Sequence, residues 1–172
     1  MAESAPSPNS LVINALITRG YRIAVAESLT GGQLIASLVD VAGASAALSG
    51  GVVAYDTALK HSVLGVSEEL LSSKGAVDPE VARQMAAGVR TALAVDGREP
   101  HVGISTTGVA GPEPQDGQPV GRVFVGVAIG DQVTAHELSL SGTRRDIQSA
   151  TVNEALAILL DELSESPVRH RE

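Results

Sequence analysis

The chain has 172 residues, which is enough for one domain with a substantial core, whereas a second domain would be cramped. Twenty Asp and Glu against 12 Lys and Arg give a net charge of −8, which argues against a general nucleic-acid-binding surface because such a surface needs a basic face. The two Tyr, one Phe and no Trp nearly exclude recognition of bases by stacking. The absence of Cys rules out disulfide scaffolds, thiolate zinc sites and cysteine nucleophiles.

The two ends of the chain have the composition of tails. Residues 1–8 are small, polar and proline-containing, without the basic segment and apolar run of a signal peptide. We therefore expect a flexible tail over 1–8, a single domain over 9–165 and a second tail over 166–172. No stretch approaches the roughly 18 to 20 apolar residues that span a bilayer, so the expectation is a cytoplasmic protein without membrane contact.

Apolar periodicity interrupted by Gly, Asp and Pro predicts alternating helices and strands. The helices are expected to start after Asn9 or Ser10 (ending at Gly20), at Gly32, at Asp56 or Thr57, near Ser67, at Asp78-Pro79 (running through Val95) and at Thr143. The strands are expected over 22–28, 50–55, 101–108, 122–130 and 132–141, the last two joined by a hairpin at Gly130-Asp131. This order predicts a three-layer α/β/α sandwich with a mixed, partly parallel central sheet.

The first candidate site is the segment 26–32, AESLTGG. A serine at a strand end, followed by glycines that open a helix, lies at the carboxyl edge of the sheet, where open α/β sheets bind ligands. Free amides at the helix start can hold a phosphate or an oxyanion. The alternative is structural, with Ser28 and Thr30 capping the helix and the glycines permitting a tight turn.

The second candidate pairs Tyr55, at a strand end, with Lys60, about one turn into the next helix. Both can then face the same sheet edge as Ser28. A serine hydroxyl needs a base before it attacks, and lysine can be that base when burial or a nearby cation lowers its pKa. The alternative is a solvated lysine beside a half-buried tyrosine.

Two further segments contain candidate ligand-binding groups. Hydroxyls at 105–107 precede a Gly/Pro-rich loop over 108–121, and a loop of this length is either functional, disordered or simply a long turn. Arg144 and Arg145 begin the last helix, where cations oppose the helix macrodipole. An anionic ligand would compensate them, but so would Asp146 or Glu137.

Other chemistries have little support. The four His residues form no close pair of metal ligands. No G-x-S-x-G elbow is present, and no S-x-x-K pattern follows a nucleophile. Nothing in the sequence favours a Ser-His-Asp triad.

Four segments in this order resemble the CinA C-terminal domain family: AESLTGG at 26–32, GGVVAYDTALK at 50–60, TTGVAGP at 106–112 and GTRRDIQ at 142–148. The resemblance covers nearly the whole chain between the tails. Family members commonly have a cysteine where this chain has Leu29, and a glycine pair where it has Glu113-Pro114.

The resemblance implies an amidase that converts nicotinamide mononucleotide to nicotinate mononucleotide and ammonia in pyridine-nucleotide salvage, without a metal or organic cofactor. Its motifs imply three catalytic residues: Ser28 as the nucleophile, Lys60 as the base and Tyr55 as a hydrogen-bond partner of one or both. Either Lys60 or Tyr55 would return a proton to the departing ammonia. The oxyanion donors would be amides near Gly31 and Gly32 or the Thr107 hydroxyl, and the phosphate would lie at Arg144 or the helix start. The implied substrate-binding residues are Thr30, Gly31, Gly32, Thr107, Gly108, Ala110, Gly111 and Arg144.

Three other functions stay open at this point. The chain is alternatively a non-catalytic nucleotide-binding module, an amidase for another small amide, or a partner protein in DNA uptake or repair, as the family's competence/damage-inducible name suggests. The charge of −8 disfavours direct contact with nucleic acid. The expected partner is a small nucleotide, and the high aliphatic content favours a homo-oligomer.

Overall fold

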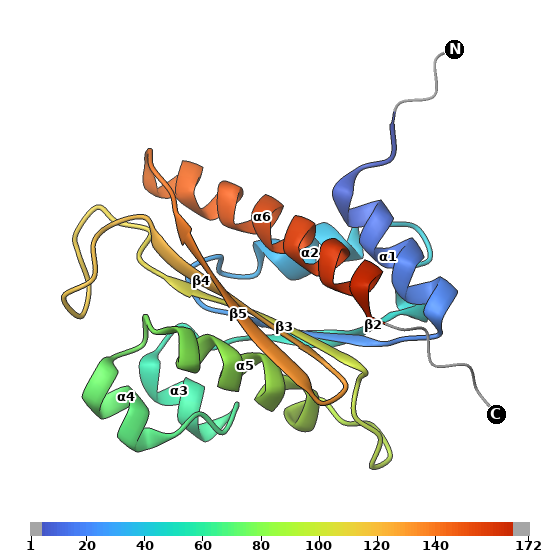
Figure 1. The fold of residues 1–172 in the computed structure, drawn as a ribbon, viewed down its shortest axis with the longest axis horizontal. Helices are drawn as coiled ribbons and strands as arrows, with labels where there is room; N and C mark the ends of the chain where they lie inside the picture. Colours follow the sequence, from blue (N-terminus) through green and yellow to red (C-terminus); the bar gives the residue numbers. More distant parts are fainter. Residues whose placement is uncertain (1–4, 167–172) are drawn as a thin grey trace.

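A computed structural model describes residues 5–166, and in that range five strands form one sheet (Figure 1). The strands are β1 (Ile23–Glu27), β2 (Leu48–Val53), β3 (Val102–Gly108), β4 (Arg122–Ile129) and β5 (Gln132–Ser139), in the spatial order β2-β1-β3-β4-β5. β1 pairs in parallel with β2 and β3, whereas β4 pairs antiparallel with β3 and β5. The predicted mixed sheet with a β4–β5 hairpin is confirmed.

Helices cover both faces of the sheet, as Figure 1 shows. One face carries α1 (Pro8–Arg19), α2 (Gln33–Val39) and α6 (Arg144–Glu165), and the other carries α3 (Thr57–Ser62), α4 (Glu68–Lys74) and α5 (Pro79–Ala92). A short 3-10 helix, η1 (Ala44–Ala46), precedes β2. The α/β/α sandwich is therefore confirmed. Among residues 5–166, no helix has the length and apolar character to cross a membrane.

Several element ends differ from the prediction. Helix α1 begins at Pro8, one residue inside the predicted tail, because proline suits the first helical position and Ser7 precedes it as N-cap. The predicted cap Asn9 instead donates a hydrogen bond to the Ser37 carbonyl at 2.7 Å, which links α1 to α2. Helix α5 ends at Ala92 and not at Val95. The predicted tail segments 1–4 and 167–172 lie outside the described residues.

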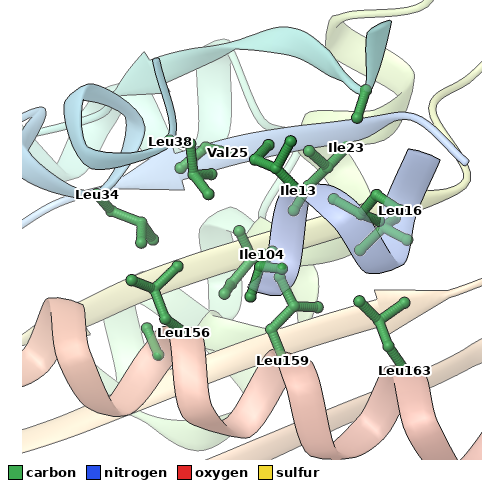
Figure 2. Close-up of a cluster of buried hydrophobic side chains, with 14 of the residues drawn as sticks. Ile13, Leu16, Ile23, Val25, Leu34, Leu38, Ile104, Leu156, Leu159 and Leu163 are labelled. Carbon is green, nitrogen blue, oxygen red and sulfur yellow. The ribbon is translucent and has the colours of Figure 1, made fainter. Parts of the chain in front are cut away.

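The larger hydrophobic cluster lies between the sheet and the helices α1, α2 and α6. Figure 2 shows Leu156, Leu159 and Leu163 of α6 pointing toward aliphatic side chains of the sheet. Helices α1 and α2 extend the same cluster with Ile13, Leu16, Leu34 and Leu38. An almost wholly aliphatic core is what the scarcity of aromatic residues predicts.

On the opposite face, α5 packs against β3 and β4 at close range because two strand positions lack a side chain. A Cβ at Gly103 or Gly126 would collide with the backbone carbonyls of Ala86 and Ala82 in α5. The same face of β3 presents the Ser105 hydroxyl, which donates to the Ala82 carbonyl at 2.7 Å. This close packing fixes β3, and with it the loop that leaves its carboxyl end.

Candidate active site

Ser28 occupies the position that the strand–turn–helix pattern predicts. Strand β1 ends at Glu27, and the chain turns through Gly31 and Gly32, whose φ angles of 57° and 100° lie in the left-handed region that favours glycine. Ser28 is 9% exposed at the carboxyl edge of β1. The turn thus places a nearly buried hydroxyl where open sheets bind ligands.

The amides that open α2 are occupied by a neighbouring side chain. The buried Glu27 carboxylate accepts from the amides of Gly32 at 3.1 Å, Leu34 at 3.0 Å and Ile35 at 2.8 Å. The Gly31 amide donates to the Ser28 carbonyl at 3.1 Å. The Gly31 and Gly32 amides thus have partners within the protein, which argues against these two amides as donors to a phosphate or oxyanion.

Two predicted ligand-binding hydroxyls also have buried partners. The Thr30 and Thr106 hydroxyls lie 2.8 Å apart, and both side chains are fully buried. Thr107, on the alternate face of β3, donates to the Ala76 carbonyl at 2.7 Å. Because neighbouring strand residues point to opposite faces, Thr107 points toward the α5 side, and its hydroxyl proton is used in the hydrogen bond to Ala76.

Lys60 lies next to Ser28. Asp56 caps α3 by accepting from the Ala58 amide at 2.8 Å, and Lys60 follows on that helix, 1% exposed. Its Nζ donates to the Ser28 Oγ at 3.0 Å and to the Ala54 carbonyl at 2.7 Å. The alternative of a solvated surface lysine is thus excluded.

Burial changes the acid–base character of this amine. Desolvation lowers the pKa of Lys60 from 10.5 to about 8, against the opposing effect of the negative charges of Asp56 and Asp116. A substantial fraction of the amine is then neutral near physiological pH and can accept a proton. A hydroxyl within hydrogen-bond distance of such an amine is the arrangement that activates a serine nucleophile.

Tyr55 and Arg144 form a second pair at the mouth of the site. The Arg144 guanidinium donates to the Tyr55 hydroxyl and to the Gly111 carbonyl, each at 2.6 Å. Tyr55 is 60% exposed. Its hydroxyl was expected to bond with Ser28 or Lys60, but it bonds with Arg144 because the tyrosine lies past the end of β2, at the rim of the site.

At the start of α6, a carboxylate of the helix itself offsets the unfavourable interaction of Arg144 and Arg145 with the helix macrodipole. Thr143 and Asp146 form a capping box, in which the Asp146 carboxylate accepts from the Thr143 amide at 2.8 Å and from its hydroxyl at 2.7 Å. These hydrogen bonds lower the pKa of Asp146. The helix end therefore needs no external anion, and the case for a ligand at Arg144 rests on its place at the cavity.

A cavity of about 300 Å³ joins these groups at the carboxyl edge of the parallel strands. It is lined by Ser28, Leu29, Tyr55, Arg144 and the loop residues 108–115. Of the predicted ligand-binding residues, Gly108, Ala110, Gly111 and Arg144 line it, whereas Thr30, Gly31, Gly32 and Thr107 do not. Lys60 lies behind Ser28, and in the described range no three acidic or histidine side chains cluster to hold a metal ion.

Asp116 and Gln115 belong to the site but were not singled out from the sequence, whereas Glu113 was noted there as a departure from the family pattern. Asp116 lies 56 residues beyond Lys60 in the sequence, and its negative charge acts to raise the pKa of Lys60. The Asp116 carboxylate also accepts from the Ala76 amide at 3.2 Å. Glu113 and Gln115 contribute polar groups to the cavity wall. No local pattern marks these loop residues, since their position depends on how the loop folds back.

Leu29 lies between the cavity and a small apolar cluster. Leu29 is 3% exposed and packs with Ala110, Val123 and Ile147, and its backbone carbonyl accepts from Gln148 at 2.8 Å. The residue beside Ser28 is thus fixed by packing on α6. Its departure from the cysteine that family members commonly carry changes no hydrogen bond of the Ser28–Lys60 pair.

Comparisons with known proteins agree with this description. Residues 7–163 match the family model described as the CinA C-terminal domain. A CinA-like protein of Frankia casuarinae is 44% identical over 153 residues, which is 89% of this chain and 34% of that protein. A CinA-like protein of Dictyoglomus turgidum is 39% identical over 91% of this chain and 37% of its own length. The chain therefore spans about a third of the length of these curated relatives.

Solved structures of similar size match nearly end to end. A CinA superfamily protein of Klebsiella pneumoniae superposes with a TM-score of 0.86 at 32% identity, covering 92% of this chain and 97% of that one. A competence-damaged protein (CinA) superfamily member of Escherichia coli gives a TM-score of 0.85 at 30% identity, covering 94% and 93%.

Proposed function

The chain belongs to the CinA C-terminal domain family, and on that premise we propose that it is an amidase that hydrolyses the carboxamide of nicotinamide mononucleotide. The observation that carries the proposal is the contact of 3.0 Å between the Ser28 hydroxyl and the buried, pKa-lowered amine of Lys60. A module that merely binds a nucleotide has no need of a desolvated amine against a serine hydroxyl.

In the first half of the reaction, Lys60 in its neutral form takes the proton of Ser28 as Oγ attacks the carboxamide carbon. The resulting lysine ammonium lies close to the developing oxyanion and stabilises its charge electrostatically. The same ammonium then returns its proton to the departing ammonia. The product of this half is a nicotinoyl ester on Ser28.

In the second half, water attacks the ester carbon and Lys60 again serves as the base. The bond to Ser28 Oγ breaks, the proton returns to the serine, and nicotinate mononucleotide leaves with its new carboxylate. The amine thus acts as base and acid in turn, which requires a pKa near the operating pH. Its value of about 8 suits that requirement.

Arg144 is the proposed phosphate ligand. It lines the same cavity as Ser28, and a guanidinium matches the geometry of phosphate oxygens. Tyr55, held by Arg144 at 2.6 Å, would orient it toward the phosphate. The occupied amides of α2 favour this assignment over the helix start.

The proposal is tested by measuring ammonia release from nicotinamide mononucleotide, nicotinamide riboside, NAD and asparagine by the purified protein, with and without a chelator. We expect release from the mononucleotide at the highest kcat/KM, unaffected by the chelator. Release from another amide alone would keep the reaction and replace the substrate. Binding of the mononucleotide by calorimetry without any ammonia would favour the non-catalytic module.

A further inference from the structure

Glu27, the residue before the proposed nucleophile, is buried at the end of β1. Glu27 is 1% exposed, and a fully buried carboxylate requires several hydrogen bonds to offset the loss of hydration. Both carboxylate oxygens accept from backbone amides: Oε2 from Gly32 and Leu34, and Oε1 from Ile35. The side chain therefore holds the first turn of α2 to the end of β1.

The backbone of the same residue reaches the other half of the site. The Glu27 carbonyl accepts from the Ala54 amide at 2.8 Å, and the Ala54 carbonyl accepts from Lys60 Nζ at 2.7 Å. Glu27 is thus connected to Lys60 through Ala54 and is covalently joined to Ser28. Its side chain and backbone together fix the frame in which Ser28 Oγ and Lys60 Nζ lie 3.0 Å apart.

We propose that Glu27 is a positioning residue, whose carboxylate holds the Ser28 turn so that the hydroxyl stays within reach of Lys60. This inference rests on the proposed function of Ser28 as a nucleophile. Glu27 does not line the cavity, so it acts through Ser28 and not on the substrate. The carboxylates that raise the pKa of Lys60 are Asp56 and Asp116, so we expect removal of the Glu27 charge to leave that pKa unchanged.

The test uses Glu27→Gln and Glu27→Asp in the full chain. Glutamine keeps the size of the side chain but replaces one acceptor oxygen by an NH₂ group that faces an amide donor. Aspartate keeps the charge but shortens the reach by one methylene. Asp78→Asn is the matched control. The Asp78 carboxylate caps α5 by accepting from the backbone amide of Glu80 at 2.8 Å, and Asp78 lies outside the cavity lining.

Two readouts are measured at a temperature where circular dichroism shows each protein folded. We expect both variants to lower kcat by about 10- to 100-fold, as a misplaced nucleophile does, with KM and the pH midpoint of kcat unchanged. The second readout is the rate at which a fluorophosphonate probe labels Ser28, which depends on no particular amide substrate. We expect this rate to fall in parallel with kcat, and the Asp78→Asn rates to match wild type.

The outcomes separate this inference from the proposed function. Wild-type labelling that falls in the variants supports the positioning role even where the amide substrate proves to be a different one. Absence of labelling in the wild type would overturn the nucleophile and the positioning role together. Folded variants with wild-type kcat and labelling would overturn the positioning role alone, as would failure of both variants to fold, which would make the carboxylate a requirement of the fold itself.

Discussion

The two ends of the parallel strands differ in how their polar groups are used. At the amino edge, cavities of about 430 and 790 Å³ are lined by Arg22, Arg90 and His101, among others. At the carboxyl edge the cavity is smaller, about 300 Å³. Cavity size alone would therefore favour the amino edge, whereas the chemistry of the lining groups favours the carboxyl edge.

At the amino edge the charged groups stabilise the fold. The Arg22 guanidinium donates to the Ser49 hydroxyl at 3.0 Å and to the Leu48 carbonyl at 2.8 Å. Arg90 donates to the carbonyls of Pro100 and Gly130, at 2.8 and 2.6 Å. At the carboxyl edge, by contrast, a desolvated amine contacts a hydroxyl that lines the cavity. A reactive pair is thus a stronger indication of an active site than volume or charge.

Removal of the proposed nucleophile at the carboxyl edge is expected to lower activity more than any other change. We expect Ser28→Ala to lower ammonia release from nicotinamide mononucleotide by about 1,000-fold or more, because no group is left to form the ester. The matched control at the amino edge is Ser49→Ala, which removes a hydroxyl bonded to Arg22. Equal activity of the two variants in a steady-state ammonia assay would show that the edges are not functionally different.

Removal of the base comes next. Lys60→Met should lower kcat by about 100-fold or more, since proton transfer then falls to water. Wild-type kcat should rise with pH through about 8, as the amine loses its proton, and the variant should lose this rise. The control is Lys74→Met at the end of α4, measured over the same pH range. A wild-type pH profile in Lys60→Met would eliminate Lys60 as the base.

Substitution of Arg144 tests where the phosphate of the substrate binds. We expect Arg144→Gln to raise KM for nicotinamide mononucleotide by about tenfold, or about 1.4 kcal/mol, with a smaller change for nicotinamide riboside, which has no phosphate. Arg22→Gln at the amino edge should leave both KM values unchanged. An equal loss for nucleotide and riboside would assign Arg144 to the cavity wall and not to the phosphate.

The last expected effect is on the free energy of unfolding and not on activity. The pKa of Lys60 is about 8 when folded and about 10.5 when unfolded, so the unfolded chain holds one more proton between these values. The free energy of unfolding should therefore increase with pH across that window, by up to about 3 kcal/mol. Denaturant titrations of wild type and Lys60→Met at pH 7.5 and 10 check this, since the variant should lack the increase.

Local signals predicted most of the fold and the reactive pair. The cap at Asp56, the glycine turn after Ser28 and the hairpin at Gly130-Asp131 each depend on neighbouring residues, and all are found where the sequence places them. Ser28 and Lys60 were expected at one edge because both follow parallel strands. The partners of the α2 amides were not predicted, because capping rules describe side chains at the helix start and Glu27 lies at the end of the preceding strand.

The loop over 108–121 marks the limit of sequence-based prediction. Its Gly and Pro content excludes regular structure but says nothing of where Asp116 lies relative to Lys60. The same holds for the bond from Arg144 to Tyr55, whose partners are 89 residues apart. Both contacts depend on tertiary packing between segments that are far apart in the sequence.

The leucine packed beside Ser28 has a consequence for redox chemistry. With Leu29 buried among Ala110, Val123 and Ile147, the site contains no thiol, and the whole chain contains no cysteine. Peroxide and thiol-modifying reagents therefore have no sulfur group to attack next to Ser28. A single cysteine introduced anywhere on the surface would be the sole thiol in the molecule, so spectroscopic labels can be attached to either edge of the sheet without background.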